Sequence, residues 1–90
     1  MIKRNKVTVV GSGYVGMSLS VLFAQHNDVI VLDIDTVRVD KINKGQSTVK
    51  NRALDSFLKN EPLTLNATLD KEFAFKNSKF IVIATPTNYD

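Results

Sequence analysis

The feature that most constrains this chain is a glycine-rich hexapeptide, GSGYVG, at residues 11–16. The segment before it, Lys6–Val10, is short and β-branched, which predicts a strand buried on both faces. The segment after it, from Val15 to about Gln25, carries apolar residues at helical spacing. A strand, a glycine turn and a helix therefore follow one another within about twenty residues, an order typical of a phosphate-binding turn.

The three glycines of this motif have separate mechanical purposes. Gly11 permits a tight turn out of the strand, and Gly13 has no Cβ, so a pyrophosphate can approach the backbone. Gly16 lets the helix pack close to the sheet. Phosphate oxygens would then meet free N–H groups at the positive end of the helix, so the motif predicts a dinucleotide site.

Two acids follow the next predicted strand, Asp28–Asp33. We expect Asp33 to accept hydrogen bonds from the adenosine ribose, with ligand and solvent offsetting the cost of placing a carboxylate there. Asp35 is better placed to cap the following helix. Because a carboxylate repels a 2′-phosphate, the predicted cofactor is NAD rather than NADP, although Arg38 lies near in sequence.

Strands and helices alternate along the chain, which predicts an α/β fold with a parallel sheet and right-handed crossovers. The expected strand order is Leu65–Leu69, Asp28–Asp33, Lys6–Val10, Phe80–Ala84, or 3-2-1-4, which is the incomplete first half of a doubly wound Rossmann-type sheet. The expected helices are residues 15–25, 36–44, 51–59 and a turn or short helix at 70–77. In the first helix the predicted sheet-facing residues are Val15, Leu19, Leu22 and Phe23.

Composition narrows the possible partners. Twelve Lys and Arg against nine Asp and Glu give a net charge of +3, but only Lys3, Arg4 and Lys6 cluster, and they are interpreted as a solvated N-terminal tail. No aromatic residues interleave with the cations, so nucleic acid is not expected as a partner. The chain has no cysteine and no long apolar run, which favours a cytoplasmic protein with no membrane partner.

Other candidate residues carry less weight. Tyr14 either packs over the cofactor diphosphate or merely covers the start of the helix. His26, the only histidine, lies in a predicted turn with no acid or serine around it, and we expect no catalytic role for it. No residue pattern predicts a metal site.

The chain closes with ATPTNYD after its last predicted strand. In the expected strand order this loop lies beside the glycine turn, at the crevice where strand order reverses and ligands bind. Thr85 and Thr87 are therefore candidates for cofactor contact, although both could simply terminate the strand.

Four segments carry a family resemblance: VTVVGSGYVGMSLSVLFAQHNDVIVLDID, VDKINKGQS, ATLD and IVIATPTNYD. Together they resemble the N-terminal domain of the UDP-glucose 6-dehydrogenases, within the wider UDP-glucose/GDP-mannose dehydrogenase family. The resemblance implies NAD-dependent oxidation of the C6 hydroxyl of UDP-glucose to UDP-glucuronate in two hydride transfers, as in polysaccharide biosynthesis. It assigns the diphosphate to the backbone of Gly11, Gly13, Tyr14, Val15 and Gly16. It assigns the ribose to Asp33, the adenine side to Arg38 and a further cofactor contact to Thr87.

The chain departs from the family in length. Members of the family have about 400 residues and use a catalytic cysteine that this chain lacks, so no catalytic residue can be assigned here. We therefore expect residues 1–90 to be a partial N-terminal NAD-binding domain without the substrate and C-terminal domains. The full-length enzyme is expected to form a homodimer, whereas the 90-residue piece could self-associate through its open sheet edge. Two alternatives remain: a sister enzyme acting on UDP-N-acetylmannosamine or GDP-mannose, and a stand-alone nucleotide-sensing module.

Overall fold

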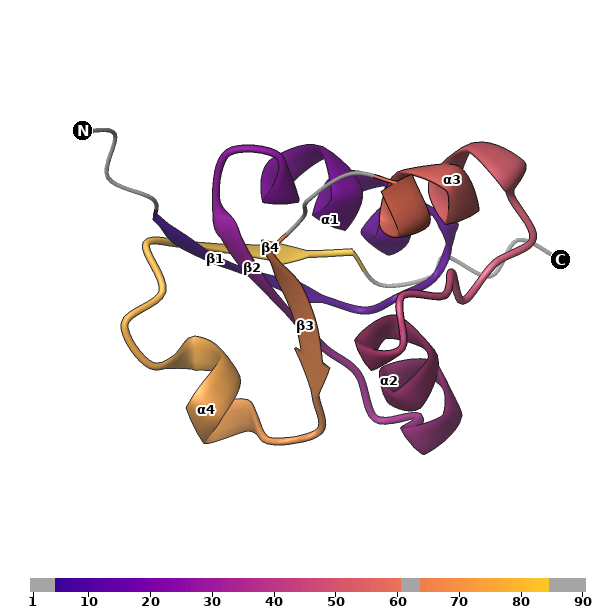
Figure 1. The fold of residues 1–90 in the computed structure, drawn as a ribbon. Helices are drawn as coiled ribbons and strands as arrows, with labels where there is room; N and C mark the ends of the chain where they lie inside the picture. Colours follow the sequence, from indigo (N-terminus) through magenta and orange to yellow (C-terminus); the bar gives the residue numbers. More distant parts are fainter. Residues whose placement is uncertain (1–4, 61–63, 85–90) are drawn as a thin grey trace, which may run out of the picture.

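The computed structural model describes residues 5–60 and 64–84, which form one parallel sheet with helices on both faces (Figure 1). The sheet order is β3-β2-β1-β4. The predicted α/β class and strand order are thus confirmed, and each strand ends within one residue of its predicted limit. The strands are β1 (Lys6–Val10), β2 (Asp28–Leu32), β3 (Leu65–Thr68) and β4 (Phe80–Ile83).

The helices divide unequally between the two faces of the sheet. They are α1 (Tyr14–Ala24), α2 (Thr36–Asn43), α3 (Arg52–Asn60) and α4 (Lys71–Phe75). The larger core joins α1, α2 and α3 to one face through Met17, Ile42 and Leu54, whereas Ala74 of α4 packs with Ile30 on the other face. The sheet is covered from both sides, as expected for a doubly wound arrangement.

Helix α1 corrects one expectation from the sequence. Val15 and Leu22, predicted to face the sheet, are 60% and 59% exposed. The buried face is instead made of Met17 and four smaller residues, Gly16, Ser20, Val21 and Ala24. Of the predicted stripe, Phe23 is partly buried and packs against the core. Small side chains let the helix axis approach the strands, and the Ser20 hydroxyl donates to the Gly16 carbonyl at 2.7 Å, so its burial leaves no unpaired polar atom. The need for α1 to pack close to the sheet therefore determines which of its faces is buried, more than the size of its apolar side chains does.

Lys6 corrects another expectation, because it is not part of a solvated tail. Its Nζ donates to the carbonyl oxygens of Phe73 at 2.8 Å and Lys76 at 2.6 Å, and lies 5.3 Å from the centre of the Phe73 ring. These carbonyls belong to the last turn of α4 and its C-cap, where a helix leaves carbonyl groups without internal partners. Thr8, fully buried on the same strand, donates to the carbonyl of Ala74 at 2.5 Å. Strand β1 thus fixes the end of α4.

The two edges of the sheet differ. On the outer side of β3, the side-chain amide of Asn43 donates to the Ala67 carbonyl at 3.1 Å and accepts from the Ala67 N–H at 2.8 Å. On the opposite side, β4 pairs only with β1 among the described strands, and Phe80, Ile81 and Ile83 are 57%, 49% and 69% exposed. One edge is partly closed by a side chain and the other is open.

Candidate functional site

The glycine turn has the geometry that its sequence predicts. Gly11 has φ of +100°, in the region that favours glycine, and its N–H donates to the Leu32 carbonyl at 2.8 Å. A Cβ on Gly16 would lie 2.2 Å from the Gly11 carbonyl oxygen and 3.5 Å from the Cβ of Ala84. A Cβ on Gly13 would meet no atom within 4 Å. Gly16 therefore permits close packing of the helix on its own turn and on the end of β4, whereas Gly13 faces open space.

The start of α1 is left without a cap, unlike the starts of two other helices. Gly13 provides no side-chain hydrogen bond, and the first turn of α1 contains no acid. By contrast, Asp35 accepts from the N–H groups of Val37 and Arg38 at the start of α2, and Asp70 caps α4 in the same way. The prediction that Asp35 is a cap is confirmed. The uncapped N–H groups of α1 form a positive end suited to an anion.

Asp33 follows β2 directly and is 8% exposed. Its Oδ2 accepts from the N–H of Ser12 at 3.0 Å and from the Ser12 hydroxyl at 2.5 Å, and its Oδ1 accepts from the N–H of Asp35 at 2.9 Å. The expectation that ligand and solvent offset the buried charge is therefore wrong, because the protein supplies these donors itself. The carboxylate ties the second strand to the glycine turn.

These contacts also set the ionisation of Asp33. Burial acts to raise the pKa of its carboxyl, but the hydrogen bonds from Ser12 and Asp35 and the positive charge of Arg38 outweigh burial and hold the pKa below its usual value. The nearest guanidinium nitrogen of Arg38 lies 3.8 Å from Oδ2. Asp33 is thus an anion at neutral pH. Among the described residues, Oδ1 accepts only one hydrogen bond, so it keeps capacity for a ligand hydroxyl.

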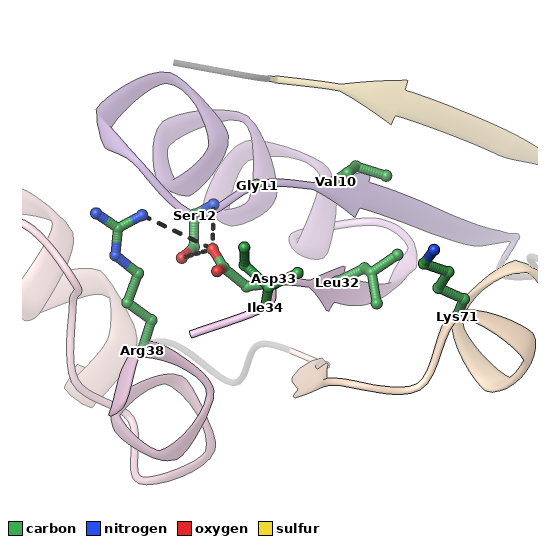
Figure 2. A pocket seen from close by; sticks show the side chains of 8 residues that line it. All are labelled: Val10, Gly11, Ser12, Leu32, Asp33, Ile34, Arg38 and Lys71. Atoms are coloured by element: carbon green, nitrogen blue, oxygen red, sulfur yellow. Dashed lines mark hydrogen bonds and ion pairs between the residues drawn. The ribbon is translucent and has the colours of Figure 1, made fainter. Parts of the chain in front are cut away.

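A pocket of about 360 Å³ opens beside this carboxylate (Figure 2). Its volume falls within the roughly 300–1,000 Å³ typical of small-molecule sites. Asp33 and Arg38 lie at one end and Lys71 at the other, as Figure 2 shows. The remaining lining is largely apolar: Val10, Gly11, Ser12, Leu32 and Ile34. An apolar slot with a carboxylate at its rim suits a flat base attached to a sugar with free hydroxyls.

Tyr14 and His26 do not line this pocket. Tyr14 lines a hollow between α1 and α3 rather than this pocket, and its side chain is 61% exposed. His26 is exposed, as expected. Thr85 and Thr87 lie outside the described residues. The last described residue before them, Ala84, donates its N–H to the Val10 carbonyl at 2.8 Å, so the end of β4 lies next to the glycine turn.

Two residues at the site were not singled out from the sequence. Ser12 is fully buried and supplies two of the donors to Asp33. Thr48, from the segment between α2 and α3, donates its hydroxyl to the Ser12 carbonyl. A hydroxyl residue between two motif glycines was a usable signal for Ser12. Nothing local marks Thr48, because its contact spans 36 positions of sequence.

Two further kinds of site were sought in the part of the chain that the structure describes. No group of three acidic, histidine or cysteine side chains is arranged there to hold a metal ion. None of the helices described has both the length and the apolar character needed to cross a membrane.

The residues present fit a dinucleotide. The open position at Gly13, the uncapped start of α1 and the ionised Asp33 beside an apolar pocket together offer partners for a diphosphate, a ribose and a base. The fit comes from backbone groups and one carboxylate, all held in place by the fold. It does not depend on the residues outside the described ranges.

Comparison with known proteins gives the same assignment. Residues 5–90 match the model of the UDP-glucose/GDP-mannose dehydrogenase family, NAD binding domain. The chain is 45% identical over 85 residues to a UDP-glucose 6-dehydrogenase of Streptococcus pneumoniae, covering 94% of this chain and 22% of that protein. A UDP-glucose 6-dehydrogenase of Campylobacter jejuni is 39% identical over 87 residues, again with 94% and 22% covered. The chain therefore spans about a fifth of the length of these relatives.

Solved structures show the same fold. A ternary complex of GDP-mannose dehydrogenase from Pseudomonas aeruginosa matches with a TM-score of 0.83 at 25% identity, over 93% of this chain and 20% of that one. The UDP-N-acetyl-mannosamine dehydrogenase Cap5O from Staphylococcus aureus matches with a TM-score of 0.78 at 32% identity, over 91% and 20%. With the glycine turn, the ionised Asp33 and these similarities together, the chain belongs to the UDP-glucose/GDP-mannose dehydrogenase family, as its NAD-binding domain.

Proposed function

We propose that this chain is the coenzyme-binding part of a UDP-glucose 6-dehydrogenase, which oxidises UDP-glucose to UDP-glucuronate with two NAD. The observation that carries the proposal is the 45% identity to a UDP-glucose 6-dehydrogenase across 94% of the chain, which includes the glycine turn and Asp33. Residues 1–90 would then be a partial N-terminal domain, and the substrate-binding and catalytic residues would lie in the part of the enzyme beyond it.

The site residues have distinct roles in this proposal. The backbone N–H groups at Gly13, Tyr14, Val15 and Gly16 hold the diphosphate, with Gly11 providing the turn that presents them. Asp33 accepts a ribose hydroxyl through Oδ1, which the geometry leaves available. Arg38, which lines the pocket, would contact the adenine side of the coenzyme. A contact of Thr85 and Thr87 with the coenzyme stays a prediction from the sequence.

The chemistry divides between the coenzyme and the protein. Bound NAD would accept the hydride from the sugar carbon. The described residues contribute by binding and orientation: they fix the adenosine half at one end of the crevice, so that the rest of the coenzyme extends across the ends of β1 and β4. We assign neither proton transfer nor covalent catalysis to the described residues.

Activity of the intact protein tests the substrate. NADH formation should be observed with UDP-glucose, at two NADH per sugar, and should be much weaker with GDP-mannose or UDP-N-acetylmannosamine. The second candidate, a sister dehydrogenase, is supported by the structural matches to enzymes for those two sugars. A preference for either of the other sugars would replace UDP-glucose in the proposal. Purified residues 1–90 alone should oxidise none of the three.

Coenzyme selection tests Asp33. In the intact protein, Asp33→Asn should weaken NAD binding and reduce the preference for NAD over NADP, because the repulsion of a 2′-phosphate is lost. Asp40→Asn is a matched control, since Asp40 of α2 pairs with Lys44, the C-cap of that helix, and lies outside the pocket lining. Unchanged selectivity in Asp33→Asn would refute the role of Asp33. Titration calorimetry with both coenzymes measures the effect.

The proposal extends to partners and location. A homodimer of the full-length enzyme and a cytoplasmic location are the expected properties, and UDP-glucose is the expected substrate partner. Sedimentation and cell fractionation of the intact protein test the first two. Neither nucleic acid nor membrane is proposed as a partner.

A further inference from the structure

The segment between α2 and α3, residues 44–51, is connected to the glycine turn by a side-chain hydrogen bond. Helix α2 ends at Asn43, and after its C-cap Lys44 the chain turns back toward the start of α1 at Gly45, which has φ of +75°. Thr48 donates its hydroxyl to the carbonyl oxygen of Ser12. The contact joins two polar groups that are distant in sequence, while the neighbouring Val49 packs against the hydrophobic core.

With this contact, both backbone polar groups of Ser12 have a side-chain partner. On one side, the N–H of Ser12 donates to Asp33 at 3.0 Å. On the other, its carbonyl accepts from Thr48. The peptide planes before and after Ser12 are therefore each held by a side chain from a different segment. Glycines restrict the backbone of this turn very little, so the hydrogen bonds with Asp33 and Thr48 set the orientation of its peptide groups.

The plane after Ser12 contains the N–H of Gly13. In a trans peptide the carbonyl oxygen and the N–H of the next residue point in opposite directions, and no cis bond occurs in the described residues. Holding the Ser12 carbonyl toward Thr48 therefore directs the Gly13 N–H away from it. Among the described residues the Gly13 N–H makes no backbone hydrogen bond, so it is available to a ligand, and a Cβ on Gly13 would meet no atom within 4 Å.

We propose that Thr48 is a positioning residue of the coenzyme site: by holding the Ser12 carbonyl, it orients the Gly13 N–H toward the coenzyme diphosphate. This role rests on the proposed function, in which the turn binds that diphosphate. Thr48 touches neither the ribose nor the base side of the pocket, whose lining does not include it. Its effect should therefore be confined to ligands that carry a diphosphate.

A purely structural role for Thr48 is separable, because the neighbouring serine stabilises the segment itself. The Ser47 N–H donates to Asp55 at 3.1 Å and its hydroxyl donates to the Val49 carbonyl at 2.8 Å. These bonds connect the segment to α3 and to itself, not to the glycine turn. Ser47→Ala is therefore a matched control that weakens the segment while leaving the Thr48 contact in place.

The test compares ADP with adenosine in the intact protein by titration calorimetry. Thr48→Val, which keeps the shape and removes the hydroxyl, should raise the Kd for ADP by about 5- to 10-fold, the effect of one lost hydrogen bond of roughly 1–1.4 kcal/mol. The Kd for adenosine should stay unchanged. Thr48→Ser should restore ADP binding, and Ser47→Ala should lower the melting temperature without an effect specific to ADP.

The outcomes separate the two levels of the proposal. If Thr48→Val binds ADP as the unmodified protein does, or loses ADP and adenosine equally, Thr48 does not position the diphosphate donors. If the unmodified protein binds neither ligand, the proposed function itself fails. Circular dichroism of each variant confirms that the fold is kept, and Thr48→Ser provides a folded comparison in which the hydroxyl is present.

Discussion

At the scale of single residues, the site is specified by which positions exclude a side chain and which require one. Gly13 and Gly16 belong to the same motif but are glycines for different reasons. An added Cβ at Gly13 meets open space, whereas at Gly16 it meets a backbone carbonyl at 2.2 Å. Only the second position is needed for folding.

Alanine at each position should separate these reasons. Gly16→Ala should lower the free energy of unfolding by about 1–3 kcal/mol or more, because the clash is with backbone that cannot rotate away. Gly13→Ala should leave stability almost unchanged, since φ at Gly13 is −72°, yet it should weaken NAD binding by blocking the approach of the diphosphate. Urea unfolding and coenzyme titration measure the two effects. Equal losses of stability in both variants would contradict this distinction.

The ionisation of Asp33 predicts a dependence of stability on pH. Burial alone would raise the pKa, but the hydrogen bonds from Ser12 and Asp35 and the charge of Arg38 lower it below the unfolded value. A carboxyl with a lowered folded pKa stabilises the fold above its unfolded pKa. That contribution disappears as pH falls through the folded pKa. Asp33→Asn should therefore reduce the loss of stability below about pH 4.

Urea unfolding at a series of acidic pH values measures this effect. Asp40→Asn provides the comparison, since Asp40 forms only an exposed ion pair with Lys44. If both variants follow the same acid limb as the unmodified protein, Asp33 contributes nothing to it.

The residues of the site were only partly predictable from the sequence. The glycine motif and an acid after the next strand mark a recognisable pattern, so Gly11, Gly13, Gly16 and Asp33 could be named in advance. Ser12 and Thr48 could not, because their importance depends on which backbone groups the folded chain brings within hydrogen-bond distance. The spacing of apolar residues predicts single helices and strands, and it gives no information about hydrogen bonds between distant segments.

At the scale of elements, α1 shows where pattern reasoning fails. Counting large apolar residues predicted a buried stripe through Val15 and Leu22, both of which are exposed. The true contact face contains small residues because the helix must approach both the sheet and its own glycine turn. Start and end of the helix were predictable from the motif and the polar turn after it, whereas its rotation was not.

The rotation of α1 can be tested with two truncations. Met17→Ala should cost about 2–5 kcal/mol of stability, because the side chain is fully buried and its loss leaves a cavity. Leu22→Ala should change stability by no more than about 0.5 kcal/mol, because that side chain is 59% exposed. Thermal or urea unfolding measures both. A larger loss in Leu22→Ala than in Met17→Ala would show that the helix is rotated from the orientation described.

At the scale of the whole molecule, the sheet order followed from alternation of strands and helices alone, because right-handed crossovers leave few parallel arrangements. The difference between its two edges did not. It depends on Asn43, whose side chain pairs with both backbone groups of Ala67. Residues 5–60 and 64–84 form a layered domain with helices on both faces of the sheet (Figure 1). Asn43 partly covers the β3 edge, whereas β4 pairs only with β1 among the described strands and leaves its other edge open.

This open side predicts self-association of residues 1–90 when isolated. Sedimentation velocity should show a mass that rises with concentration, because β4 presents unpaired backbone groups and three exposed apolar side chains. Ile83→Lys should shift the species toward monomer without loss of helical signal, since Ile83 is 69% exposed and a charge on an edge strand disfavours pairing. Lys79→Ile, just before the strand, is the reverse control and should increase association. A monomer at all concentrations would contradict the prediction.

The amide of Asn43 has a further consequence for the size of any such assembly. A sheet grows into a fibril only if both of its edges can pair with further strands. Here Asn43 of α2 occupies backbone groups on the β3 edge. Two copies joined through β4 would leave as outer edges the two β3 strands, each partly covered by Asn43 at Ala67. Assembly should therefore stop at a dimer with one continuous eight-stranded sheet and should not continue into a fibril.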